Sequence, residues 1–280
     1  LGRQERTITP VDLAGNEIYE ILRKRLFASL PDQTVIDSVA AQFGQELAEA
    51  TKAKVASRGA EAISDEVAET YPFHPRLKNL VALFKENERF KQTRGLMELV
   101  SRLLKSVWSR KTNDVFLIGP QHFDLAINDV REKLAEISEM RDVIAKDLWD
   151  ANQSAHAQVI DLTRGSDATE QVGGLLLTAS LSTAVNAVKG LTREELVETL
   201  AMPNRKPSEF LEAFEQLEAS AWYLHHTPEG RYYFDRQENL TKLLQSLAND
   251  APENKVDELI RHRLGEMFKP SRKTAYDDVL

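Results

Sequence analysis

Apolar residues recur three or four positions apart along much of the chain, which is the spacing of one buried face of an α-helix. Residues 18–30, 35–47 and 92–108 show this pattern, and the last stretch is strongly amphipathic. A long polar helix is predicted from about residue 129 to residue 149. Together these stretches predict a mainly α-helical protein.

Two segments interrupt the helical pattern in the first half of the chain. The sequence Tyr-Pro-Phe-His-Pro at 71–75 is a break, because each proline disfavours helix in the residue before it. Pro75 is expected to open the next helix. The Ala- and Lys-rich stretch 51–64 is expected to be a loop or a frayed helix end. Residues 115–120 predict a short extended piece that leads to a helix near Phe123.

The second half combines helices with one pair of strands. The apolar stretch 168–182 predicts a buried helix that opens a second domain. Thr192 and Glu195 have the spacing of a capping box, and a further helix is predicted from Pro207 to Ala221. Two aromatic segments, 222–226 and 231–234, then flank the turn Thr-Pro-Glu-Gly and predict a β-hairpin.

Helix, helix and hairpin in this order are typical of a winged helix. We therefore predict a helical domain at residues 1–150, a winged-helix-like domain at 151–248, and a helical or linker segment at 249–280. The chain starts with Leu-Gly-Arg instead of Met, so we expect a piece of a larger protein.

Composition excludes several kinds of site. The chain has no cysteine, which removes disulfides and thiolate chemistry and suits a reducing compartment such as the cytoplasm. The six histidines show no metal-ligand spacing. The phosphate-binding loop of ATPases, the dinucleotide-binding glycine motif, the zinc-protease motif and the serine-hydrolase elbow are all missing from the sequence. We therefore predict no catalytic and no metal-binding residue.

Charge is unevenly distributed in a chain whose net charge is −8. Residues 76–111 contain ten basic residues and three glutamates, a net charge of +7. Such a positive segment implies an anionic neighbour, which could be a nucleotide phosphate, a nucleic acid or an acidic face of the same protein. Residues 190–248 are net −4 instead.

Arg94 is the one candidate binding residue that this pattern singles out. It lies in the first turn of the amphipathic helix at 92–108, where the helix dipole favours acids. A functional interpretation is that Arg94 grips a nucleotide phosphate with two hydrogen bonds. The alternative is a salt bridge to one of the nearby acids.

Several short motifs resemble a family of large prokaryotic ATP-binding proteins of the AAA+ class. These motifs are Tyr-Pro-Phe-His-Pro at 71–75, Arg-Phe-Lys-Gln-Thr-Arg-Gly at 89–95 and Leu-Ile-Gly-Pro at 117–120. Members of this family are predicted ATPases, often encoded near DNA-modification and phage-defence genes. Residues 20–27 resemble the start of the AAA+ lid, and residues 190–196 and 221–234 resemble the winged-helix region of the same proteins.

The resemblance implies that Arg94 occupies the position of the sensor-2 arginine, which contacts the terminal phosphates of the nucleotide from the lid. Arg23 and Arg25 lie near the basic residues at the start of the lid, and neither is assigned as an arginine finger. The parent protein would bind ATP and Mg, mostly through an N-terminal ATPase core that partners this chain. By itself, the chain is expected neither to bind ATP tightly nor to hydrolyse it.

Two alternatives remain at this stage. The chain could be a nucleic-acid- or protein-binding module without an ATPase role, or a purely structural scaffold. The predicted helix at 208–221 carries four glutamates and no basic residue. Because phosphate contacts dominate affinity for DNA, this acidic helix favours a protein partner or a spacer role.

Overall fold

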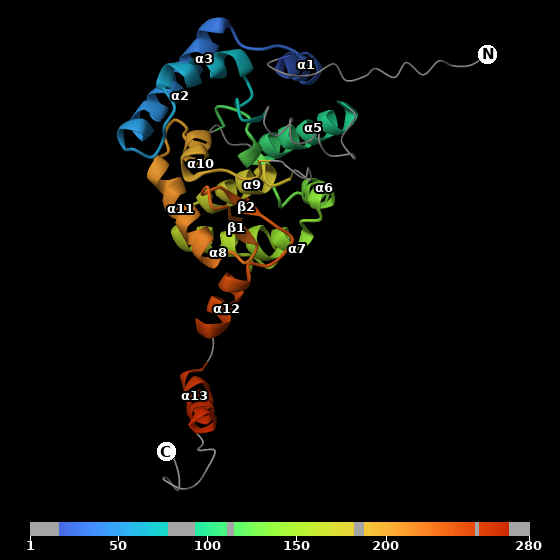
Figure 1. Ribbon diagram of the computed structural model, residues 1–280. Helices are drawn as coiled ribbons and strands as arrows, with labels where there is room; N and C mark the ends of the chain where they lie inside the picture. The colour runs from blue at the N-terminus through green and yellow to red at the C-terminus, as the bar shows by residue number, and fades with distance from the viewer. Residues whose placement is uncertain (1–16, 78–92, 111–114, 182–187, 250–251, 269–280) are drawn as a thin grey trace, which may run out of the picture. The chain divides into compact units, whose positions relative to one another are not determined.

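The computed structural model describes residues 17–77, 93–110, 115–181, 188–249 and 252–268 (Figure 1). In these ranges the protein is mainly helical and contains one two-stranded antiparallel sheet, as the sequence predicts. The elements in chain order are α1 (Glu17–Leu26), α2 (Gln33–Lys52), α3 (Ala60–Thr70), α5 (Thr93–Arg110), the 3₁₀ turn η2 (Pro120–His122), α6 (Asn128–Ser138), α7 (Arg141–Val143), the π-helical turn η3 (Ile144–Leu148), α8 (His156–Arg164), α9 (Ala168–Ala179), α10 (Arg193–Leu200), α11 (Pro207–Ser220), β1 (Leu224–His226), β2 (Tyr232–Phe234), α12 (Leu240–Asn249) and α13 (Glu253–Met267).

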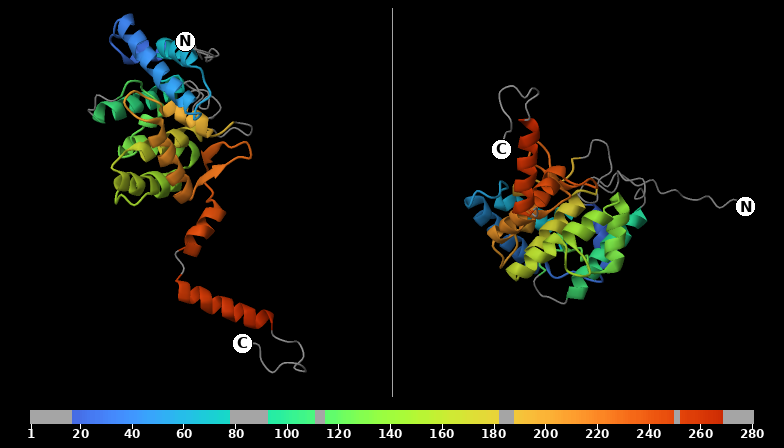
Figure 2. Two further views of the ribbon diagram at one scale, coloured as in Figure 1. Left: turned by 90° about the vertical axis from the view of Figure 1, so that its left-hand side faces the viewer. Right: turned by 90° about the horizontal axis from the view of Figure 1, so that it is seen from below.

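The chain divides into two compact units, Leu1–Asn239 and Leu240–Leu280. The predicted domain boundaries after residues 150 and 248 stay predictions. Within the first unit, α2 and α3 pack side by side, as Figures 1 and 2 both show. The predicted loop at 51–64 is therefore partly wrong, because α3 begins at Ala60 and buries Ile63 and Val67 against its neighbours.

Helix α9 forms the centre of the core in the first unit. It packs against α8, α11, η2 and β2, and ten of its twelve residues are buried. This explains why apolar residues are not confined to one stripe of its surface. Val172, Leu176 and Leu177 are each 0% exposed. The predicted buried helix is confirmed, and it ends at Ala179.

The hairpin that follows α10 and α11 pairs as the sequence predicts. Leu224 is opposite Phe234, and His226 is opposite Tyr232. A third extended segment joins this pair, because Leu191 and Tyr232 exchange backbone hydrogen bonds of 2.8 and 3.0 Å. This bridge places the start of α10 beside the hairpin.

The long helix predicted at 129–149 is wrong. Glu139 adopts a left-handed conformation with φ 58°, which ends α6, and the chain continues as α7 and η3. The break reorients the following segment so that Met140, Ile144 and Leu148 are buried. No glycine or proline marks this break, so tertiary packing and not local sequence determines it.

Asp147 in η3 connects this broken segment to the hairpin. Its carboxylate is 0% exposed and accepts hydrogen bonds from the backbone N–H groups of Trp222 and Tyr223 at 3.0 and 2.8 Å. Nδ1 of His156 lies 2.7 Å from the same carboxylate. Since His156 begins α8, one buried side chain holds η3, α8 and the start of β1 together.

Other predictions for the first half of the chain have mixed outcomes. The helix predicted near Phe123 is the short turn η2, just before that residue. The extended piece is confirmed by a parallel bridge between Phe73 and Ile118. Most of the helix predicted after Pro75 lies outside the described residues. Helix α8 has no counterpart among the sequence predictions.

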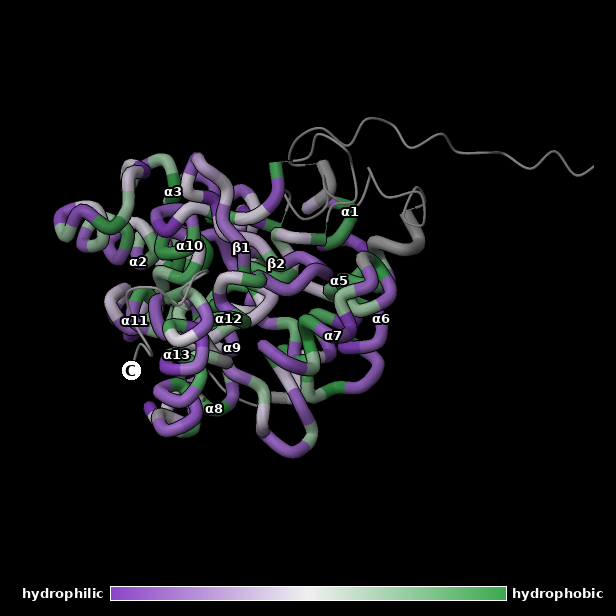
Figure 3. The backbone as a smooth tube through the Cα atoms, turned by 60° about the horizontal axis from the view of Figure 1, so that its bottom comes forward, coloured by the Kyte–Doolittle hydropathy of each residue, from purple (hydrophilic) through white to green (hydrophobic). Residues whose placement is uncertain are grey.

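The second unit consists of α12 and α13 in its described residues. Hydrophobic positions recur three or four residues apart along α13, among hydrophilic ones (Figure 3). Several large apolar side chains on both helices are exposed to solvent, among them Leu244, Leu259 and Met267. None of the described helices is both long enough and apolar enough to cross a bilayer.

Candidate functional site

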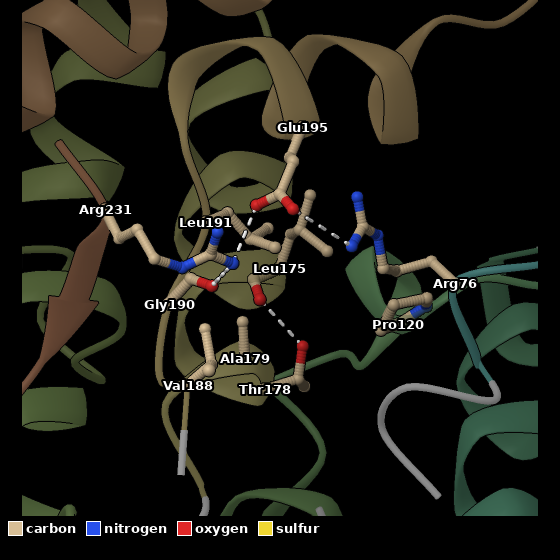
Figure 4. A pocket seen from close by; sticks show the side chains of 10 residues that line it. All are labelled: Arg76, Pro120, Leu175, Thr178, Ala179, Val188, Gly190, Leu191, Glu195 and Arg231. Carbon is tan, nitrogen blue, oxygen red and sulfur yellow. Dashed lines mark hydrogen bonds and ion pairs between the residues drawn. The ribbon is translucent and has the colours of Figure 1, made fainter. Parts of the chain in front are cut away.

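A cavity of about 220 Å³ lies beside α9 in the first unit (Figure 4). Its walls come from segments far apart in sequence: α9, the extended segment before α10, the first turn of α10, the start of β2, and two segments of the first half of the chain. The lining residues are Arg76, Pro120, Leu175, Thr178, Ala179, Val188, Gly190, Leu191, Glu195 and Arg231. We call this space the Arg76 cavity.

Local backbone structure positions the wall formed by residues 188–191. Gly190 has φ +76°, a conformation that residues with a side chain rarely adopt. Its N–H donates to the carbonyl oxygen of Ala179 at 3.0 Å, and its own carbonyl oxygen accepts from Nη2 of Arg231 at 2.8 Å. A Cβ atom at this position would overlap the carbonyl oxygen of Tyr232. The cavity wall therefore requires glycine here.

Glu195 is the central carboxylate of the cavity. The predicted capping box is confirmed, because Thr192 Oγ1 accepts from the N–H of Glu195 and Glu195 Oε2 accepts from the N–H of Thr192 at 3.1 Å. Oε2 also accepts from Nη2 of Arg231 at 2.8 Å. Oε1 lies 3.9 Å from Nη1 of Arg76, which is an ion pair but too long for a hydrogen bond.

Arg76 is the least satisfied charged group at this site. Its side chain is 18% exposed, and its Nε donates to Thr199 Oγ1 at 3.2 Å. Within the described ranges, no hydrogen bond reaches its two terminal nitrogens. Burial lowers the pKa of Arg76 below its ordinary value, and the carboxylates of Glu195 and Glu198 oppose that shift.

A second cavity of about 380 Å³ adjoins the first, and Arg76 and Glu195 line both. Glu198 holds one wall in place. Its Oε1 accepts from the N–H and the hydroxyl of Ser57 and from the N–H of Arg58, at 2.8, 3.0 and 3.1 Å. These bonds join α10 to the loop between α2 and α3 across more than a hundred residues of sequence.

His74 lines the second cavity and is 4% exposed. Its Nδ1 accepts a hydrogen bond from the N–H of Arg76 at 3.1 Å. Burial lowers the pKa of His74 from 6.5 to about 3, and the positive charge of Arg76 acts in the same direction. The ring is therefore neutral with its proton on Nε2, which has no acceptor in the part of the chain that the structure describes.

This arrangement makes stability depend on pH. As pH falls through 6.5 the unfolded chain protonates His74, whereas the folded protein does so only near pH 3. The free energy of unfolding should therefore fall by about 1.4 kcal/mol per pH unit in this window from His74 alone. Between pH 7 and pH 5 we expect this loss to be about 2 kcal/mol.

This loss of stability should be absent in His74→Asn, which keeps an acceptor near the position of Nδ1. Urea unfolding of both proteins at each pH measures the difference, and parallel curves would contradict the prediction.

The three arginines that the sequence analysis named, Arg94, Arg23 and Arg25, lie in different environments. Arg94 is the second residue of α5, and its side chain lies outside the described residues. Arg23 donates from Nη1 to the carbonyl oxygens of Glu69 and Tyr71, at 3.0 and 3.3 Å, so it caps the end of α3. Arg25 is exposed. Arg23 and Arg25 are not among the residues that line the Arg76 cavity.

Two arginines of the basic segment at 76–111 form ion pairs with acidic side chains of the same protein. Arg76 faces Glu195, and Arg102 bonds to Glu98 and Asp129. The sequence left three possible anionic neighbours for this segment: a nucleotide phosphate, a nucleic acid or an acidic face of the same protein. For these two arginines the neighbour is an acidic face of the same protein.

Sequence reasoning missed this cavity. It counted Arg76 as one basic residue among ten and identified Glu195 only as a helix cap. Arg231 appeared only as the first residue of a predicted strand. The three residues share no motif, and only the fold brings them together. No group of three or more histidine, aspartate or glutamate side chains is placed to hold a metal ion within the described ranges.

Comparison with known protein families gives one match. The model of the DUF499 second domain matches residues 14–166, which is more than half of the chain. The chain belongs to the DUF499 family. No curated protein and no solved structure matches it. The DUF499 match includes Arg76, Pro120 and Arg94, whereas Glu195 and Arg231 lie beyond it. The Arg76 cavity therefore joins the DUF499 second domain to the segment that follows.

Proposed function

We propose that this chain is the lid and winged-helix portion of a larger AAA+-type ATPase, to which it contributes Arg94 but no complete ATP site. The observation that carries the proposal is the start of α5 at Thr93. It puts Arg94 in a first turn that contains no acidic residue. The first N–H groups of a helix lack partners within the helix, so such a turn attracts anions. Arginine at this place adds a cation suited to phosphate oxygens.

The parent protein would supply most of the nucleotide site. ATP and Mg would be held by a core that carries the phosphate-binding loop, which this sequence lacks. Bound there, the nucleotide would present its terminal phosphates, and Arg94 would approach them from the lid. The role of this chain is then to position one charge and to report nucleotide binding to its other elements.

The winged-helix part of the proposal is supported by element order and strand pairing. Helices α9, α10 and α11 precede the hairpin, and Leu191 adds the short third strand that a winged helix has between its first two helices. This portion would serve as a surface for protein contact within the parent protein or with a partner.

Nucleic-acid binding is the alternative function, and the charges of α11 argue against it. All four of its glutamates already pair with arginines of the same unit: Glu209 with Arg205, Glu212 with Arg164, and both Glu215 and Glu218 with Arg193. Helix α11 has no basic residue of its own, and its glutamates already hold the arginines beside it, so this surface lacks the cationic contacts to phosphate on which most DNA affinity depends.

ATP hydrolysis by the natural full-length protein tests the proposal. We expect Arg94→Ala to lower kcat at least about 10-fold, since one lost transition-state contact typically costs 10²–10³ in rate. Lys105→Ala, an exposed change on the same helix, is the matched control and should leave kcat unchanged. The isolated chain should show no turnover. Normal turnover in the Arg94 variant would contradict a phosphate contact, and an inactive full-length protein would favour the binding-module alternative.

A further inference from the structure

The Arg76 cavity has features of a ligand site that the proposed nucleotide contact of Arg94 does not use. Figure 4 shows the guanidinium groups of Arg76 and Arg231 on two sides of the cavity, with Glu195 between them. Two positive charges and one negative charge leave this space with a net charge of +1. The other walls are largely apolar: Pro120, Leu175, Ala179, Val188 and Leu191.

The unused donors belong to Arg76. An arginine has five N–H donors, and among described partners the side chain of Arg76 uses only the one on Nε. Burial lowers the pKa of Arg76, so the surroundings disfavour its charged form. An anion in the cavity would stabilise that charge.

Glu195 does not accept a hydrogen bond from the terminal nitrogens of Arg76, because its Oε1 lies 3.9 Å from Nη1. Its Oε2 is held by the N–H of Thr192 and by Nη2 of Arg231, and its backbone lies in the first turn of α10. A shift toward Arg76 would break the capping box and the bond to Arg231. Within the described residues, the acceptors for the terminal nitrogens of Arg76 are therefore left to a ligand in the cavity.

We propose that the Arg76 cavity binds a small monocarboxylate with a short apolar body, such as a branched-chain fatty acid. A planar carboxylate matches the paired terminal nitrogens of a guanidinium. A phosphate dianion would bring excess negative charge close to Glu195. The volume of about 220 Å³ is below the 300–1,000 Å³ of drug-sized sites, so the ligand is small. The apolar walls accommodate its hydrocarbon part.

Titration of the full chain with isovalerate, followed by ligand-observed NMR, tests the site. We expect saturable binding of isovalerate and none of 3-methylbutan-1-ol, which has the same apolar body without the charge. Inorganic phosphate, which has charge without an apolar body, should not compete. Equal binding of the alcohol, competition by phosphate, or no saturable binding over the same millimolar range would overturn the proposal.

Variants locate the binding. Arg76→Gln should weaken isovalerate binding at least about tenfold, because the neutral amide removes the charge-assisted hydrogen bonds to the carboxylate. Arg58 lines only the second cavity, so the Arg58→Gln variant should bind isovalerate normally.

Val188→Asp is a second test that spares the core, because Val188 is 70% exposed at the wall of the Arg76 cavity. Its added carboxylate should repel the ligand. Unchanged binding in the Arg76 and Val188 variants would overturn the proposal. ATP hydrolysis does not enter these experiments, so this inference and the Arg94 proposal fail separately.

Discussion

Replacing Asp147 by alanine is expected to lower the free energy of unfolding by about 3 to 5 kcal/mol, as is typical when one partner of a buried charged network is removed. The carboxylate is fully buried and accepts from the backbone N–H groups of Trp222 and Tyr223. Both donors would remain without a partner in the variant, at about 1–3 kcal/mol each. Urea unfolding followed by circular dichroism measures the change.

Asp142→Ala is the matched control for this prediction. Asp142 lies five residues earlier in the same broken helical segment and is exposed. We expect its replacement to change stability by less than about 0.5 kcal/mol, as for most surface substitutions. Asp147→Asn should fall between the two, because the amide oxygen still accepts one hydrogen bond. A loss in Asp147→Ala no larger than in the control would contradict the role given to this carboxylate.

Replacing Gly190 by alanine is expected to cost about 3 kcal/mol or more, through backbone strain and steric overlap together. The residue has φ +76°, and a Cβ would overlap the carbonyl oxygen of Tyr232. That oxygen accepts the hydrogen bond from Leu191, so relief of the overlap would break the bridge that pairs Leu191 with the hairpin. Thermal and urea unfolding measure the loss.

Gly230→Ala separates the cost of backbone strain from the cost of steric overlap. Gly230 has nearly the same φ, +77°, but a Cβ there meets nothing within 4 Å. Its replacement should cost only the conformational strain of about 1–2 kcal/mol. If the two variants were equally stable, the close approach of Gly190 to Tyr232 would not constrain the fold.

The two sites of interest lie in different parts of the DUF499 chain and call for different chemistry. Arg94 at the start of α5 suits a phosphate brought by another part of the parent protein. The Arg76 cavity is built from the DUF499 second domain together with α9, α10 and the hairpin. A ligand there would contact both segments, so it would stabilise their packing.

The sequence by itself determined most of the regular elements. Apolar spacing predicted the α5 helix, uniform apolarity predicted the buried α9, and Thr192 with Glu195 predicted the start of α10. The aromatic segments around a Pro- and Gly-containing turn predicted the hairpin. Each of these signals is local, because it depends on residues a few positions apart.

Tertiary structure decided what local signals do not contain. The break at Glu139 follows from burying Met140 and Ile144 on the core, although its sequence permits a continuous helix. The meeting of Arg76, Glu195 and Arg231 likewise has no sequence signature, since these residues lie on separate elements. Helix propensity and turn chemistry act over one or two turns, whereas burial and charge pairing act between segments that only the folded chain brings together.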